Sequence, residues 1–126
     1  MAGPAFDDRD GMIWFDGKLV PWRDAKVHVL THAMHYASAV FEGERAYGGT
    51  VFKSSAHSER LKESARMLDF EVPYSPTQLD AAKALVLEKN GFTDAYVRPI
   101  AWRGSEMMGV SAQHMRMPLA RASGVK

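Results

Sequence analysis

The stretch His35-Tyr36-Ala37-Ser38-Ala39-Val40-Phe41-Glu42-Gly43-Glu44-Arg45 predicts a β-strand beside a binding site. If residues 40–47 are extended, side-chain alternation places two sets on opposite faces: Phe41, Gly43, Arg45 and Tyr47 on one, and Glu42, Glu44 and Ala46 on the other. We expect the first face to line a pocket and the second to meet solvent. A glycine within a strand often marks the close approach of a ligand, and a neighbouring arginine suits a carboxylate or phosphate. The stretch therefore predicts a pocket for a small anion.

Length and charge limit the classes of protein. The 126 residues are enough for one domain with a hydrophobic core. With 16 Lys and Arg against 15 Asp and Glu, the net charge of +1 gives no reason to expect nucleic acid or a membrane surface as partner. The absence of cysteine excludes disulfides and thiolate metal sites and fits a cytoplasmic location. Residues 1–11 are charged rather than apolar, and we expect a flexible N-terminus there and no membrane-spanning segment.

Turn residues predict two β-hairpins. Asp16-Gly17 lies between apolar runs at 12–15 and 18–22, and Gly48-Gly49 separates the strand at 40–47 from residues 50–53. Both pairs tolerate the positive φ angles of tight hairpin turns. A further strand is expected at 95–102, with Tyr96 and Arg98 on a shared face and Pro99 at an edge or at the end of regular pairing.

Two helices are expected between the hairpins and the last strand. Ser54 or Ser55 can cap the first, whose buried stripe would be Leu61, Ala65 and Leu68. The second begins at Ser75-Pro76-Thr77-Gln78, buries Leu79, Ala82 and Val86, and ends at Asn90-Gly91. Helices that alternate with hairpins predict an α+β fold with a mostly antiparallel sheet, and residues 114–126 show no period and are expected to be an irregular tail.

Several short motifs follow one another within residues 12–113: Lys26-Val27-His28-Val29, His35-Tyr36, Val40-Phe41-Glu42-Gly43, Arg45, Glu59-Arg60-Leu61, Ala95-Tyr96-Val97-Arg98-Pro99 and Met108-Gly109-Val110. In this order they resemble the N-terminal small domain of the branched-chain amino acid aminotransferases, which are pyridoxal-phosphate enzymes of fold type IV. Related enzymes, such as D-amino acid aminotransferases and aminodeoxychorismate lyases, look different at the His-Tyr and Phe-Glu-Gly-x-Arg positions and remain an alternative.

The resemblance implies roles for residues of the central strand and the first long helix. Arg60 matches the arginine that holds the cofactor phosphate, and a guanidinium is a permanently charged, bidentate partner for such a group. Phe41 and Gly43 match the pocket for the substrate side chain, and Arg45 lies on the same strand face. Residue type alone would make Arg60 an ordinary exposed helical arginine.

The resemblance also implies how substrates and subunits meet. Tyr96 and Arg98 match the pair that meets substrate carboxylates; otherwise they would be an exposed strand pair. Tyr36 and Val110 match residues that reach the neighbouring subunit's pocket, with core packing as the alternative. The implied activity is reversible transfer of the amino group between leucine, isoleucine or valine and 2-oxoglutarate, by a homo-oligomer that is at least a dimer.

The catalytic lysine of these enzymes has no match in this sequence. Transamination needs a lysine that binds the cofactor and moves a proton at the substrate α-carbon. None of the seven lysines stands in a matching context, and each is expected to be a solvated surface residue: Lys18, Lys26, Lys53, Lys62, Lys83, Lys89 and Lys126. We therefore expect a chain that departs from the family near His114, is truncated before the catalytic lysine, and is inactive in isolation.

Two alternatives come from other functional classes. His28, His32 and His35 would align three imidazoles for zinc if they shared one helix, although the flanking valines favour an extended chain. A non-catalytic interaction module would instead use apolar surface around Phe41, Tyr36 and Trp102.

Overall fold

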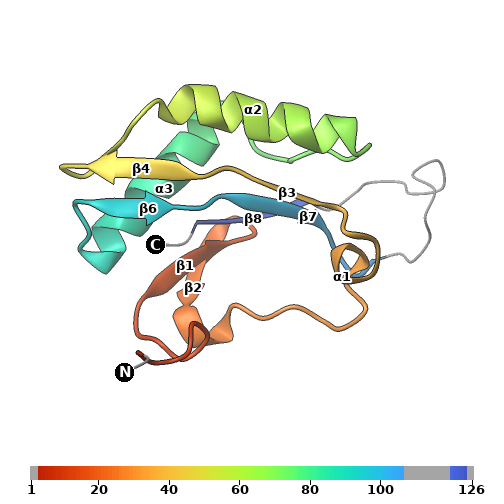
Figure 1. The fold of residues 1–126 in the computed structure, drawn as a ribbon, viewed down its shortest axis with the longest axis horizontal. Helices are drawn as coiled ribbons and strands as arrows, with labels where there is room; N and C mark the ends of the chain where they lie inside the picture. The colour runs from red at the N-terminus through yellow and green to blue at the C-terminus, as the bar shows by residue number, and fades with distance from the viewer. Residues whose placement is uncertain (1–2, 107–119, 125–126) are drawn as a thin grey trace.

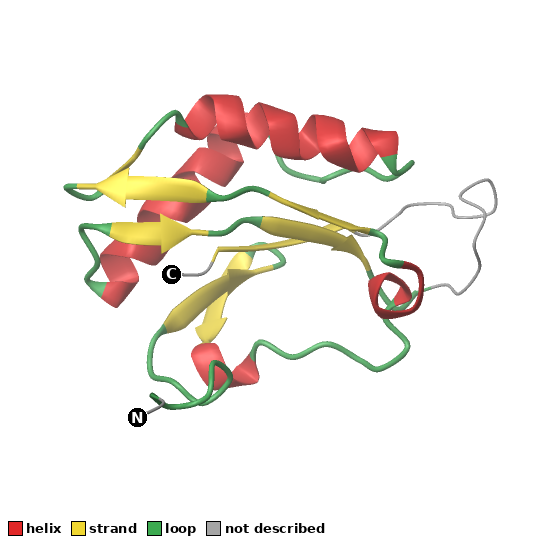
Figure 2. Cartoon of the chain, in the orientation of Figure 1, coloured by secondary structure: helices red, strands yellow, loops and turns green. Residues whose placement is uncertain are grey.

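The computed structural model of the chain describes residues 3–106 and 120–124. It contains two sheets in which all strand pairs are antiparallel. The five-stranded sheet has the order β2 (Lys18–Pro21), β1 (Met12–Phe15), β8 (Ala120–Gly124), β7 (Ile100–Arg103) and β3 (Ala39–Phe41), and the three-stranded sheet has the order β5 (Thr50–Val51), β4 (Glu44–Tyr47) and β6 (Ala95–Val97). The two long helices, α2 (Ser54–Met67) and α3 (Pro76–Asn90), pack against each other and against strands of both sheets (Figures 1 and 2). The α+β class expected from the sequence is confirmed.

Both hairpins form at the turns that the sequence predicts. β1 (Met12–Phe15) pairs with β2 (Lys18–Pro21), and Asp16 and Gly17 between them have φ angles of 52° and 96°. β4 (Glu44–Tyr47) pairs with β5 (Thr50–Val51) across Gly48 and Gly49, with φ angles of 58° and 83°. Positive φ at both central residues is the geometry of the type I′ turn, one of the two common two-residue hairpin turns.

The two long strands predicted at 40–47 and 95–102 are each divided in two. β3 (Ala39–Phe41) is continued by β4 in nearly the same direction, and β6 (Ala95–Val97) is continued in the same way by β7 (Ile100–Arg103) (Figure 1). β3 pairs with β7 in one sheet, and β4 pairs with β6 in the other. The interruption occurs where the Glu42 N–H donates to the Pro99 carbonyl oxygen at 3.0 Å, because proline has no N–H to continue the ladder.

The irregular tail expected over residues 114–126 is wrong for five of its residues. Ala120–Gly124 form β8, which lies between β1 and β7 and pairs with both. The segment consists mostly of small residues with little strand preference of their own. Its extended conformation is stabilised by backbone pairing with two neighbouring strands, which the pattern of its side chains does not indicate.

The helices follow the sequence with two corrections. α3 has the expected capping box, in which the Ser75 hydroxyl accepts from the Gln78 N–H and the Gln78 side chain accepts from the Ser75 N–H, and it ends at Gly91 with φ 68°. α2, however, is preceded by Lys53 with φ 52°, so neither predicted serine caps it. Leu61 and Ala65 are buried as expected, but Leu68 is 40% exposed because it follows the last turn of α2.

Two short elements complete the fold. Trp22–Asp24 form a 3-10 turn, η1, so that β2 ends one residue earlier than expected, and His32–Tyr36 form the five-residue helix α1. Near the N-terminus, Arg23 pairs with Asp8 and Asp10 at 2.8 Å each, so the described part of residues 1–11 contacts η1. Among the helices that the structure describes, none is long and apolar enough to cross a membrane.

Candidate functional site

The strand at 40–47 alternates as predicted, but its buried and exposed faces are reversed. Glu42, Glu44 and Ala46, expected in solvent, are 5%, 1% and 0% exposed, whereas Phe41 and Tyr47 are 52% and 61% exposed. The expected solvent face is wrong because α2 and α3 cover it and supply cationic partners for both carboxylates. The face expected to line a pocket is therefore an open surface of this chain.

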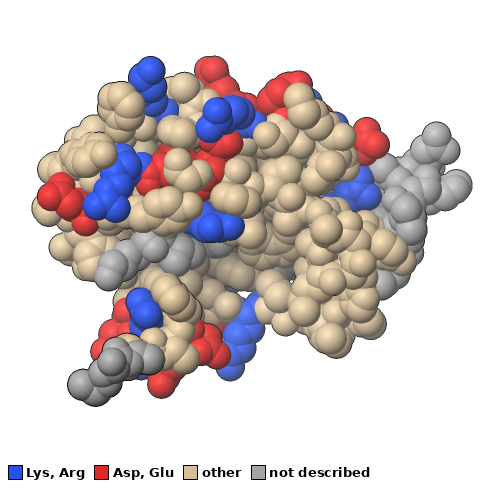
Figure 3. Space-filling view, in the orientation of Figure 1, with Lys and Arg blue, Asp and Glu red and all other residues tan. Residues whose placement is uncertain are grey.

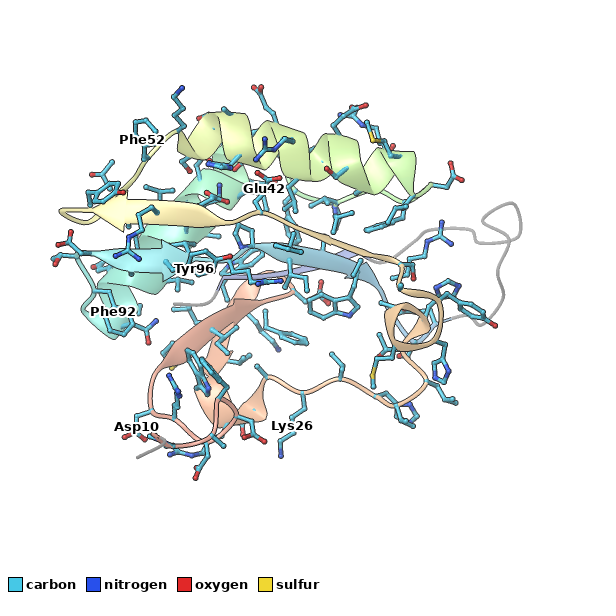
Figure 4. The ribbon with its side chains drawn as sticks, viewed as in Figure 1. Asp10, Lys26, Glu42, Phe52, Phe92 and Tyr96 are labelled. Carbon is cyan, nitrogen blue, oxygen red and sulfur yellow. The ribbon has the colours of Figure 1, made fainter. Side chains whose placement is uncertain are left out.

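Five predicted substrate residues lie together on that surface, which we call the strand-break face: Phe41, Gly43, Arg45, Tyr96 and Arg98. The Arg98 guanidinium carbon lies 3.7 Å from the centroid of the Phe41 ring, a cation–π contact. Arg45 and Tyr96 are opposite each other in the register of β4 and β6. The cluster joins residues about fifty positions apart in the sequence, and Tyr96 is labelled in Figure 4.

Gly43 gives the Tyr96 hydroxyl its room. A Cβ atom at position 43 would lie 3.0 Å from Tyr96 Oη and 3.4 Å from Cε2. The absence of a side chain thus lets the hydroxyl rest on the backbone at the strand break, as a glycine within a strand often does for a close neighbour.

Arg60 lies on α2, on the side of the strand opposite to the strand-break face, where it pairs with the buried carboxylate of Glu42. Its Nε lies 3.0 Å from both carboxylate oxygens and its Nη2 lies 2.7 Å from Oε1. His57 Nδ1 lies 2.6 Å from the same Oε1. Burial acts to raise the pKa of Glu42, but the hydrogen bonds from Arg60 and His57 together outweigh it, so that the pKa lies below its usual value. Figure 4 shows Glu42 between the strand and α2.

The remaining predicted site residues are placed differently. Tyr36 ends α1 and is 43% exposed, with its ring 4.6 Å from that of His32. Val110 lies outside the described residues. Trp102, expected to be uncovered, is only 7% exposed because β7 is covered on that side, with the Phe15 ring at 5.7 Å. Figure 3 shows charged side chains interleaved over α2 and the β4 and β6 strands, and a largely uncharged region around α1.

A second cluster of charged groups was not expected. Lys83, predicted to be a solvated surface residue, is 3% exposed, and its Nζ lies 2.7 Å from Glu44 Oε1 and 2.7 Å from the Ser58 hydroxyl. Asp80 accepts hydrogen bonds from the hydroxyls of Ser54, Ser55 and Ser58, at 2.7, 2.7 and 2.6 Å. The signal was present in the sequence, because Lys83 falls on the same helical stripe as the buried Leu79 and Val86.

The two carboxyl groups of this cluster, Glu44 and Asp80, have pKa values shifted in opposite directions. Burial raises the pKa of Glu44, although its contact with Lys83 acts in the other direction. Burial also acts to raise the pKa of Asp80, but three serine hydroxyls and the Lys83 charge outweigh it and leave the pKa low. Lys83 is enclosed between the two helices and β4, so its amine is not placed to meet a substrate.

The three histidines do not form a metal centre. α1 contains His32 and His35 but not His28, so the three imidazoles do not share a helical face. Their ring nitrogens are engaged elsewhere, with the Leu30 N–H, the Ser38 hydroxyl and the Val29 carbonyl oxygen. Within residues 3–106 and 120–124 there is no group of three His, Cys, Asp or Glu side chains that could hold a metal ion.

Comparison with known proteins adds a family and several relatives. The family model described as amino-transferase class IV matches residues 39–123. The chain is 45% identical over 114 residues to the branched-chain-amino-acid aminotransferase of Pseudomonas aeruginosa, covering 87% of the chain and 37% of that protein. It is 51% identical over 98 residues to a probable branched-chain-amino-acid aminotransferase of Rickettsia bellii, covering 78% of the chain and 34% of that protein.

Solved structures agree with these relatives. A crystal structure of the Escherichia coli branched-chain amino acid aminotransferase superposes with a TM-score of 0.84 at 38% identity, covering 92% of this chain and 39% of that one. A T.th. branched-chain amino acid aminotransferase with pyridoxamine 5'-phosphate gives a TM-score of 0.82 at 36% identity, covering 92% and 40%. The chain thus spans little more than a third of the length of the relatives that it matches.

Proposed function

Because the chain belongs to the class IV aminotransferases, we propose that it forms the small-domain part of an enzyme that transfers the amino group between branched-chain amino acids and 2-oxoglutarate. The observation that carries the proposal is the strand-break face, where an exposed aromatic ring, a glycine, a tyrosine hydroxyl and two arginines meet. Relatives at 45–51% identity are named as established or probable branched-chain-amino-acid aminotransferases, which supports the choice of branched-chain amino acids as the substrate class.

The proposed substrate site must accept both an aliphatic side chain and the second carboxylate of glutamate. Phe41 offers apolar surface for leucine, isoleucine or valine. The Arg98 guanidinium carbon lies 3.7 Å from the centroid of that ring, and this cation beside the apolar surface gives a carboxylate a partner without a buried charge left unpaired. Tyr96 directs a hydroxyl to the same surface and is assigned to the substrate α-carboxylate, with Arg45 beside it.

Pyridoxal phosphate, when bound, supplies an electron sink for deprotonation at the amino acid α-carbon. The residues of this chain fit one end of that group. Arg60 is 67% exposed, and its described contacts engage only Nε and Nη2, both with Glu42. Nη1 therefore remains available for a phosphate oxygen, and Arg60 is proposed as a ligand of the cofactor phosphate.

Proton transfer at the α-carbon requires a lysine that this sequence does not supply in a matching position. Lys83 is buried in its ion pair, and Lys62 donates to the carbonyl oxygens of Val72 and Tyr74 at 2.8 and 2.6 Å. We therefore propose that the 126 residues bind and orient substrate and cofactor, and that catalysis needs further polypeptide. The exposure of Tyr36 supports assembly with a second copy, and a cytoplasmic location is part of the same proposal.

The test is a chimera in which this chain replaces the aligned 114 residues of the Pseudomonas aeruginosa relative. We expect glutamate formation from leucine and 2-oxoglutarate, and we expect Arg98→Ala to raise KM for 2-oxoglutarate more than KM for leucine. A folded chimera that acts only on D-amino acids would overturn the substrate class. The chain alone, incubated with pyridoxal phosphate and both substrates, should form no glutamate; sustained formation would refute the lysine argument.

A further inference from the structure

We propose that Glu42 is a positioning residue, which with His57 holds one edge of the Arg60 guanidinium so that the adjacent edge is directed toward a phosphate group. The inference rests on the proposed function, since it assumes that Arg60 meets the cofactor phosphate. It goes beyond it by assigning a role to two side chains that touch neither substrate nor cofactor in that proposal.

The geometry of the guanidinium supports this division of edges. The group carries five N–H bonds in one plane, arranged as a side edge of Nε and Nη2 and an end edge of Nη1 and Nη2. Glu42 occupies the side edge, with Nε at 3.0 Å and Nη2 at 2.7 Å from its oxygens. The end edge retains two parallel N–H groups, which is the arrangement that binds an oxyanion in a bidentate manner.

The carboxylate that holds Arg60 is itself fixed from two elements. Glu42 is 5% exposed, and its backbone N–H donates to the Pro99 carbonyl oxygen across the strand break. His57, one helical turn before Arg60 on α2, brings its Nδ1 to 2.6 Å from Glu42 Oε1. The side chain of an arginine that is two-thirds exposed would ordinarily sample many rotamers. Hydrogen bonding to the buried Glu42 carboxylate, which His57 also contacts, removes most of this rotamer freedom before any ligand binds.

The charge of Glu42 and its positioning of Arg60 predict opposite effects on anion binding when Glu42 is replaced. If only the local charge mattered, removal of a carboxylate beside Arg60 would strengthen the binding of an anion. If position matters more, the loss weakens binding although the site becomes more positive. The sign of the change therefore separates the two explanations, and a neighbouring carboxylate provides the control. Glu59 is exposed, adjoins Arg60 in sequence, and has no ion pair among the described residues.

The experiment titrates the full chain with inorganic phosphate and follows the Nε–H signal of Arg60 by NMR. Glu42→Gln should weaken phosphate binding at least about fivefold and increase the mobility of the Arg60 Nε–H, while Glu59→Gln should leave binding within about twofold of the unchanged chain. Glu42→Asp, which keeps the charge but withdraws the carboxylate, should also weaken binding, and it replaces the glutamine variant if that one does not fold.

The outcomes separate failure of this inference from failure of the proposed function. If Arg60→Ala abolishes phosphate binding but Glu42→Gln leaves it unchanged or tightens it, the positioning role is overturned while the phosphate role of Arg60 stands. If the unchanged chain shows no saturable binding, or Arg60→Ala binds equally well, the phosphate role fails and the positioning role fails with it. His57→Ala should weaken phosphate binding and increase the mobility of the Arg60 Nε–H, but less than Glu42→Gln does. If His57→Ala changes neither quantity, His57 has no part in positioning Arg60.

Discussion

Replacement of Lys83 by methionine should lower the free energy of unfolding by about 3–5 kcal/mol, because it leaves a buried carboxylate without its counter-ion. The side chains of Lys83 and Glu44 are 3% and 0% exposed, and their charged atoms are 2.7 Å apart. Lys83 also donates to the Ser58 hydroxyl at 2.7 Å and the Ser54 carbonyl oxygen at 3.1 Å, which lose this donor. Against a total stability of about 5–15 kcal/mol, such a loss is large.

The same variant should be more sensitive to pH than the unchanged chain. Burial already raises the pKa of Glu44, and loss of the Lys83 charge raises it further. A carboxyl group with a higher pKa in the folded than in the unfolded state binds more protons when folded, so stability falls as pH rises through the interval between the two values. The deficit of Lys83→Met should therefore be larger at about pH 7.5 than at about pH 5.

Urea unfolding followed by circular dichroism at both pH values provides the measurement. The double variant Lys83→Met with Glu44→Leu is the control, because replacement of both partners of a buried ion pair by apolar groups is often neutral or stabilising. It should recover most of the lost stability. The reasoning is refuted if Lys83→Met costs less than about 1 kcal/mol, or if the double variant is less stable than the single one.

Three further predictions concern other parts of the fold. Gly43→Ala should change unfolding free energy by less than about 1 kcal/mol but shift the Tyr96 ring signals in an NMR spectrum, since the new Cβ would lie 3.0 Å from Tyr96 Oη; unchanged signals would contradict it. Ser75→Ala should cost about 1 kcal/mol in urea unfolding through loss of the capping box, and Thr77→Ala, which leaves the box intact, should cost clearly less. The pKa of Asp80 in the folded chain is below its usual value, so its contribution to the free energy of unfolding is present above the pKa of the unfolded state and is lost as pH falls through the pKa of the folded state. Asp80→Asn should therefore make the free energy of unfolding fall less steeply as the pH is lowered, and an unchanged slope would contradict this prediction.

The sequence predicts best the features that depend on neighbouring residues. The turn at Asp16-Gly17, the turn at Gly48-Gly49 and the start of α3 at Ser75 each follow from a few adjacent side chains with defined backbone preferences, and all three form as expected. The strand break and β8 depend instead on residues far along the chain. Pro99 alone indicates that regular pairing ends there, but its position opposite Glu42 follows from the pairing of segments far apart in the chain, and residues 120–124 are a strand because they pair with both β1 and β7.

The reversed faces of the central strand show which further signal the sequence contained. Alternation groups Glu42 with Glu44 correctly, but composition alone assigns two carboxylates to solvent, because burying an unpaired charge is costly. That cost is met only if cations lie on the elements that cover the strand, and the covering helices contain Lys83, on an apolar stripe, and Arg60. Burial of a lysine at a core position of a helix is unfavourable alone, and so is burial of alternating glutamates on a strand. Both can be buried when the opposite charges lie next to each other. Their joint presence therefore predicts that the helices pack on the carboxylate face, and the opposite face, with Phe41, is then the one left open for a ligand.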